Sequence, residues 1–132
     1  MKNILVAAGL FVSTFLVADE VLYCVPDLST GFKYTNNSFN ETNFNVSRFS
    51  MKVNGDFESI HIDDWKYSCK KSHLDKIYLC DDIYDIGYSL KFNKENGRFI
   101  KAELSGYGYL MHSSTKNPPD FDQVAAGKCE KF

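Results

Sequence analysis

The chain has 132 residues, a net charge of −2 at pH 7, and 44% hydrophobic against 24% charged residues. This length is typical of one domain and suffices to bury a core. Lysines and arginines are interspersed with acidic residues and form no basic stripe, which argues against a nucleic-acid partner.

The N-terminus predicts a secretory signal peptide. Lys2 precedes an apolar run over residues 4–17, Ala18 offers a small residue for cleavage, and Asp19 and Glu20 end the run. A membrane helix needs about 20 apolar residues, so an uncleaved anchor is the less favoured alternative, and no later stretch predicts a span. The short leader with a single lysine favours a bacterial source. We therefore expect a signal peptide over 1–18 and a single domain over 19–132, periplasmic or secreted.

Four cysteines follow the predicted cleavage site: Cys24, Cys69, Cys80 and Cys129. An even number in an oxidising compartment predicts two disulfides, with three possible connectivities. We favour Cys69–Cys80, which closes a short loop between two candidate strands, with Cys24–Cys129, which ties the chain ends together. Pairing Cys24 with Cys69 and Cys80 with Cys129 stays open. The absence of a C-x-x-C spacing argues against zinc, and the structural use of all four argues against a catalytic cysteine.

The first part of the domain contains two short extended segments and an asparagine-rich segment. Residues 20–25 predict a strand that ends at Pro26-Asp27, and residues 30–34 begin a second extended piece. Residues 36–47 spell three glycosylation triplets, but asparagine also suits turns. We expect an ordered loop there that carries no sugar in a bacterium.

Two hairpins are predicted next. Residues 49–53 and 57–62 alternate around Asn54-Gly55, the residue pair that a tight type I′ turn favours. Leu90 and Phe92 lead into a longer loop that closes at Asn96-Gly97. Beyond Phe99, the apolar residues Ile100 and Ala102 shift the alternation and suggest a β-bulge.

The remaining segments also read as strands. Residues 65–71, 76–82 and 106–111 are rich in aromatic and apolar side chains, 114–122 predict a loop around Pro118-Pro119, and 123–132 predict a closing strand with a bend at Gly127. About eight strands result. We therefore expect an all-β fold, either an antiparallel up-and-down β-barrel or a small β-sandwich, with two disulfides.

Candidate catalytic or metal-binding groups are sparse. His61 and Asp63 would share one face of a strand, but no third member of a site is recognisable. Asp81, Asp82 and Asp85 gather three carboxylates without the spacing of a calcium loop. The sequence therefore predicts no cofactor, no metal site, no catalytic residue and no enzymatic activity.

Tyrosines are the better candidates for a binding surface, because each has a large apolar ring and a polar tip. Tyr84, Tyr88, Tyr107 and Tyr109 lie around the second hairpin, together with Ser105. We predict these five residues as the binding site, while packing between strands is the alternative use of the tyrosines.

The chain resembles small exported bacterial β-rich proteins of uncharacterised function. The resemblance lies in Tyr23-Cys24 followed by Gly31-Phe32 and Tyr34, in the ending over 127–132, and in the segments LKFN and NGRF of the second hairpin. These motifs span the domain loosely and imply a disulfide-linked fold without a catalytic residue.

The segment LSGYGYLM is also similar to a loop of the periplasmic inhibitors of c-type lysozyme, which are small exported β-barrels. Here Gly108 stands before Tyr109 where those proteins have a basic residue, and their second signature is missing. We therefore expect an exported, non-enzymatic domain that binds a protein or a small ligand. The alternatives are an enzyme inhibitor that inserts residues 105–109 and a secreted hydrolase that uses His61 or His112.

Overall fold

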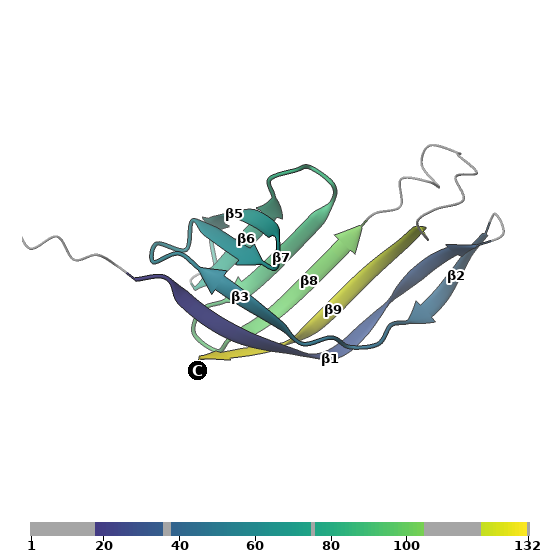
Figure 1. The fold of residues 1–132 in the computed structure, drawn as a ribbon, viewed down its shortest axis with the longest axis horizontal. Helices are drawn as coiled ribbons and strands as arrows, with labels where there is room; N and C mark the ends of the chain where they lie inside the picture. Colours follow the sequence, from purple (N-terminus) through teal and green to yellow (C-terminus); the bar gives the residue numbers. More distant parts are fainter. Residues whose placement is uncertain (1–17, 36–37, 75, 105–119, 132) are drawn as a thin grey trace, which may run out of the picture.

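The computed structural model describes residues 18–35, 38–74, 76–104 and 120–131, which form a single antiparallel sheet (Figure 1). Neighbouring strands follow the order β2-β1-β3-β4-β5-β6-β7-β8-β9, and β9 pairs back with β1. Eight strands therefore close into an up-and-down barrel, and β2 is an additional strand beside β1. The strands are β1 (Glu20–Thr35), β2 (Ser38–Asn43), β3 (Phe49–Val53), β4 (Ser59–Ile62), β5 (Trp65–Lys71), β6 (Ile77–Asp82), β7 (Tyr88–Asn93), β8 (Arg98–Leu104) and β9 (Asp120–Lys131). The expected all-β fold is confirmed, as a barrel rather than a sandwich.

Strand β1 is longer than the sequence predicts. The expected end at Pro26-Asp27 is wrong, because the strand continues through a β-bulge between Pro26 and Leu28. Proline lacks an N–H donor and is tolerated at such an irregularity. One edge of β1 pairs with β9, and the other pairs first with β3 and then with β2. Figure 1 shows the second half of β1 and β2 extending beyond the barrel.

The asparagine-rich segment is largely a strand and not a loop. Residues 38–43 form β2, which pairs with Thr30–Thr35, and only residues 44–48 connect it to β3. The ring of Phe39 packs against Tyr34 at 5.2 Å and Phe32 at 6.1 Å between centroids. Such cross-strand aromatic contacts stabilise a hairpin that asparagine propensity alone would not predict. Asn36 lies outside the described residues.

The prediction of a tight two-residue turn at Asn54-Gly55 is also wrong. Residues 54–58 connect β3 to β4, and Phe57, not Gly55, has the positive φ, at 56°. Phe57 is buried against Tyr78 and Phe92, with ring centroids 4.9 and 6.0 Å away. Burial of this ring at one end of the barrel therefore overrides the local preference for a two-residue turn.

The hairpin of β7 and β8 differs from expectation in one respect. Gly97 has the positive φ that such a turn needs, at 73°. The predicted shift of alternation after Phe99 is wrong, since the register runs without interruption from Phe92 opposite Phe99 to Tyr88 opposite Glu103. Ile100 consequently points outward with 51% of its surface exposed.

The other predicted strands are largely confirmed. The segments 65–71 and 76–82 correspond to β5 and β6. The predicted loop over 114–122 is wrong at its end, because β9 already begins at Asp120. At Gly127 a Cβ atom would lie 2.2 Å from the carbonyl oxygen of Val25, so this position requires glycine for close strand approach. The segment 106–111 lies outside the described residues.

The barrel interior is apolar over most of its length. Alternating residues of each strand face inward and exclude water from a continuous core. Its most deeply buried side chains include Leu22, Met51, Val53, Ile60, Ile62, Leu90, Phe92 and Phe99. At the end formed by the β3–β4 and β7–β8 connections, Phe57 seals this core, and the ammonium group of Lys94 lies 4.5 Å from the centre of its ring.

Both disulfides have the predicted pairing. Cys24 bonds to Cys129 across β1 and β9, and Cys69 bonds to Cys80 across β5 and β6. In each case the two residues lie directly opposite one another on neighbouring strands. The disulfides therefore tie adjacent strands at fixed register.

We predict that the Cys24–Cys129 disulfide contributes more stability than the Cys69–Cys80 disulfide. Their sequence separations are 105 and 11, and closing a longer loop removes more entropy from the unfolded chain. Replacing Cys24 and Cys129 together by alanine should cost about 2 kcal/mol more than replacing Cys69 and Cys80, as measured by urea unfolding. Equal losses in the two double variants would contradict this account.

Candidate functional site

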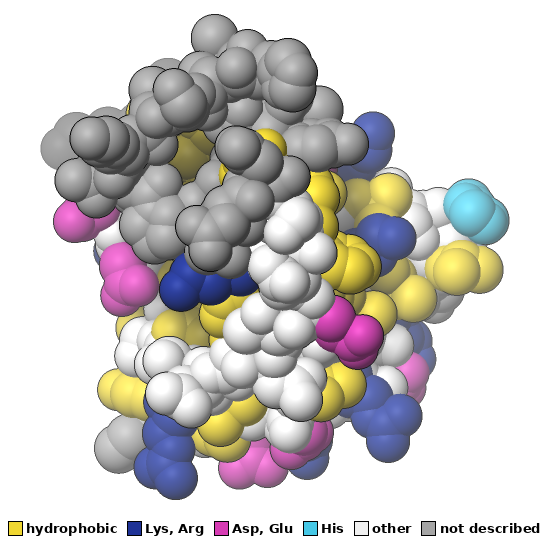
Figure 2. All heavy atoms as spheres, turned by 90° about the vertical axis from the view of Figure 1, so that its right-hand side faces the viewer, with side chains coloured by type: hydrophobic (Ala, Val, Ile, Leu, Met, Phe, Trp, Pro, Cys, Tyr) yellow, Lys and Arg dark blue, Asp and Glu magenta, His cyan; other side chains and the backbone are white. Residues whose placement is uncertain are grey.

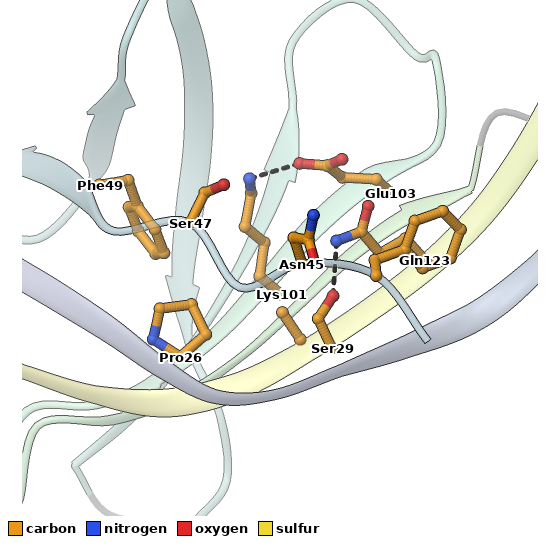
Figure 3. Close-up of a pocket in the computed structure, with 10 residues that line it drawn as sticks. Pro26, Ser29, Asn45, Ser47, Phe49, Lys101, Glu103 and Gln123 are labelled. Atoms are coloured by element: carbon orange, nitrogen blue, oxygen red, sulfur yellow. Dashed lines mark hydrogen bonds and ion pairs between the residues drawn. The ribbon is translucent and has the colours of Figure 1, made fainter. Parts of the chain in front are cut away.

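A cavity of about 470 Å³ lies between β1, β8, β9 and the connection over residues 44–48. Figure 3 shows side chains from all of these segments converging on it. Its polar lining consists of Ser29, Asn45, Ser47, Lys101, Glu103 and Gln123. This volume is within the range of about 300–1,000 Å³ that small-molecule sites occupy.

An ion pair forms one wall of the cavity. Lys101 and Glu103 follow Phe99 on the inward face of β8, and the Lys101 ammonium donates a hydrogen bond to the Glu103 carboxylate. Their side chains are only 19% and 23% exposed. The ammonium also lies 5.2 Å from the centre of the Phe49 ring, which packs edge-on against Phe99. The pair is thus held in place by an aromatic support.

A hydrogen-bonded pair forms the wall on β1 and β9. Gln123 Nε2 donates to the Ser29 hydroxyl at 2.6 Å, and the Ser29 side chain is buried. Ser29 faces inward because the bulge after Pro26 shifts the alternation of β1 by one residue. Without the bulge, Leu28 would occupy the inward position.

The connection over residues 44–48 covers the cavity. The Phe44 N–H donates to the Ser29 carbonyl oxygen at 3.1 Å, and the Phe44 ring packs against Phe121 at 5.7 Å between centroids. These contacts anchor the connection to β1 and β9. They place Asn45 and Ser47, from the third glycosylation triplet, at the cavity.

Polar groups continue from the cavity into the barrel. Tyr67 is 1% exposed, and burial, together with the negative charges of Glu103 and Asp82, raises its pKa. Burial and the same two carboxylates also raise the pKa of Tyr88. Glu103 lines the cavity and lies opposite Tyr88 on β7, so its negative charge acts on phenols of the barrel as well.

Asp82 supports the turn between β6 and β7. Its Oδ1 accepts hydrogen bonds from the N–H groups of Tyr84 at 2.8 Å and Ile86 at 3.3 Å, and its Oδ2 accepts one from Tyr88 at 2.9 Å. Carboxylate acceptors of several N–H groups organise turns in this way. The buried Asp82 is consequently a structural residue of this turn.

Two of the predicted binding tyrosines lie together, but outside the cavity lining. Trp65 packs edge-on against Tyr84 at 5.5 Å and Tyr88 at 5.2 Å between centroids. Tyr84 is 54% exposed, whereas Tyr88 is partly buried. Ser105, Tyr107 and Tyr109 lie outside the described residues.

The predicted His61 and Asp63 lie together at a second hollow. With Val21, Ser50 and Lys52 they line a space of about 390 Å³, and all five residues are exposed. The expectation that both lie on one strand is wrong, because β4 ends at Ile62 and Asp63 belongs to the turn that follows, with a φ of 50°. His112 lies outside the described residues. Among 18–35, 38–74, 76–104 and 120–131, no three His, Cys, Asp or Glu side chains are arranged to hold a metal ion.

Charges are dispersed over the face that carries β1, β2 and β9. Figure 2 shows basic, acidic and hydrophobic side chains intermixed on this face, without a gathering of lysines and arginines. Within the part of the chain that the structure describes, no helix has the length and apolar character to span a membrane.

Comparisons with protein-family models, curated proteins and solved structures find no match to this chain. The candidate site therefore depends on its geometry alone. Sequence reasoning missed all of its polar residues. Uninterrupted alternation from Phe99 would have placed Lys101 and Glu103 inward, but charged residues in strands are usually assigned to solvent.

Removing the Asp82 carboxylate should destabilise the barrel. We expect Asp82→Ala to lower the free energy of unfolding by about 3 kcal/mol, because the N–H groups of the turn lose a charged acceptor. Asp81→Ala is the matched control on the exposed face of the same strand and should change stability by less than about 0.5 kcal/mol. Similar losses in both variants, measured by chemical denaturation, would be inconsistent with this role.

The raised pKa of Tyr67 predicts a loss of stability in alkali. Above about pH 10 the unfolded phenol ionises while the folded one keeps its proton, so the free energy of unfolding falls by about 1.4 kcal/mol per pH unit for each such group. Tyr67→Phe should reduce this slope, as measured by urea unfolding across the alkaline range. An unchanged slope would show that Tyr67 does not carry the effect.

Proposed function

We propose that this protein is an exported, non-enzymatic β-barrel that binds a small polar ligand in the cavity between β1, β8, β9 and residues 44–48. The observation that supports this proposal is the ion pair of Lys101 and Glu103 on the cavity wall. Removing two charges from water costs several kcal/mol per ion, and an apolar pair would fill the barrel at lower cost. A cavity-facing ion pair is therefore better explained by recognition than by packing.

Binding is favoured over turnover by the chemistry of the lining. The described residues at the cavity include no histidine or cysteine, and its two charged groups pair with each other. Two disulfides support an oxidising compartment, to which the signal peptide predicted over residues 1–18 would direct the chain.

The proposal predicts that the ion pair serves binding at no gain in stability. Lys101→Met alone should lower the free energy of unfolding by about 3 kcal/mol, because the carboxylate of Glu103 loses its partner. Lys101→Met combined with Glu103→Leu should restore or exceed the original stability. Lys128 and Glu130 form a matched pair on the outer face of β9, 56% and 72% exposed, and replacing both should have little effect.

Ligand binding is tested on the same variants. Ligand-observed NMR with a mixed set of amino acids, hexoses and short alcohols should detect a compound that binds the original protein and the Lys128/Glu130 variant. The same compound should not bind the folded Lys101→Met/Glu103→Leu variant. Binding that survives in this variant, or binding of no compound to any form, would refute the proposed function.

A further inference from the structure

We propose that the ligand of this cavity is a neutral polyhydroxylated ring with the size and chemistry of a monosaccharide, an inference that rests on the proposed function. Three properties of the cavity lead to this class of compound. They are its balanced charge, the donor and acceptor character of its polar groups, and its apolar walls.

The charge of the lining is balanced at short range. The ammonium of Lys101 is in direct contact with the carboxylate of Glu103, and they are the only charged side chains among the described residues of the lining. A ligand with a net charge would approach one of them favourably and the other unfavourably. It would also compete with the existing pair, whereas a neutral ligand leaves that pair intact.

The uncharged polar groups match hydroxyls. Asn45 and Gln123 carry amides, and Ser29 and Ser47 carry hydroxyls, so all four side chains both donate and accept hydrogen bonds. Lys101 only donates, whereas Glu103 accepts when it is ionised. A hydroxyl both donates and accepts, so a ring with several hydroxyls can satisfy every member of this set.

The remaining lining is apolar. Pro26, Phe44, Phe49 and Ala125 face the cavity between the polar walls. Sugar rings have polar edges and faces of C–H groups, which apolar side chains can cover. A fully apolar ligand would cover the polar groups of Asn45 and Gln123 without offering them hydrogen bonds, and a charged ligand would gain little from the apolar part of the lining. Alternation of polar and apolar surfaces is thus the feature that selects a polyhydroxylated ring.

Comparing neutral hexoses with their charged derivatives tests this inference. Glucose, galactose and mannose are each titrated into the isotopically labelled exported protein beside the corresponding uronate and 2-amino sugar, at mildly acid pH. Benzyl alcohol and alanine serve as apolar and zwitterionic probes. We expect at least one neutral hexose to bind about tenfold more tightly than its two charged derivatives, with amide shifts at residues 44–49, 101–103 and 123–125.

The outcomes separate this inference from the proposed function. If a uronate, an amino sugar, benzyl alcohol or alanine binds at this cavity as tightly as any hexose, the ligand class is wrong and the binding function stands. Binding of no probe to the original protein would overturn the ligand class, and the broader screen above decides the function. Shifts confined to other residues also overturn the assignment of the site.

Variants of the ion pair should change the order in which the cavity prefers neutral and charged sugars, a change that a purely structural role of the pair would not produce. Glu103→Gln leaves the ammonium of Lys101 uncompensated, so the preference should move to the uronate of the same hexose by about tenfold. Lys101→Met should move it to the amino sugar, and the double variant Lys101→Met/Glu103→Gln should keep the neutral preference with weaker binding. Lys128→Met on the outer face is the control and should keep the original order. An unchanged order in Glu103→Gln would overturn the inference even if Lys101→Met does not fold.

Discussion

The pairing of β1 with β9 is the contact on which the rest of this structure depends. It joins the first and last described strands, closes the sheet, and carries a disulfide that links its facing cysteines. Its backbone approach is close, since a Cβ at Gly31 would lie 1.9 Å from the carbonyl oxygen of Asp122. The bulge after Pro26 interrupts this pairing once and thereby turns Ser29 toward the interior. Closure and construction of the cavity therefore depend on the same pair of strands.

The interior divides into two chemically different layers. Phe57, Tyr78 and Phe92 pack together at one end, where apolar burial supplies the stability of the fold. Toward the other end, Glu103 on the cavity wall lies opposite Tyr88 on the neighbouring strand, and its negative charge helps to raise the pKa of the buried Tyr67. Proteins bury charged groups at a cost, and the apolar layer offsets that cost by keeping the barrel closed. This division lets one end of a small barrel be polar without loss of the fold.

Patterns that depend on the whole domain were predictable from the sequence. Alternation located most strands, and the candidate pairing of Cys69 with Cys80 followed from their places on two neighbouring strands. Local signals failed where tertiary contacts outweighed them. Proline predicted an end to β1, but pairing with β9 carries the strand past it. Asn54-Gly55 predicted a tight turn, but burial of Phe57 selects a longer connection.

The candidate site was harder to predict for a physical reason. Its residues are polar, and polarity in a strand is ordinarily a sign of the solvent face. Lys101 and Glu103 violate that rule, and Ser29 violates it because the bulge shifts the alternation of β1 by one residue. Of the suggested tyrosines, Tyr84 and Tyr88 contact Trp65 instead of lining the cavity. Inward-facing polar residues of a barrel thus depart from the alternation by which strands are recognised in a sequence.

The positions of the two disulfides divide the barrel into equal parts. One lies between β5 and β6 and the other between β9 and β1, so four strands of the barrel lie on either side. Each half is a continuous stretch of chain, β1 to β5 in one and β6 to β9 in the other. Covalent bonds therefore cross both seams between the halves, while no covalent cross-link lies within either half. With both bonds formed, the two halves stay joined at both seams, so they cannot separate completely unless a disulfide is broken.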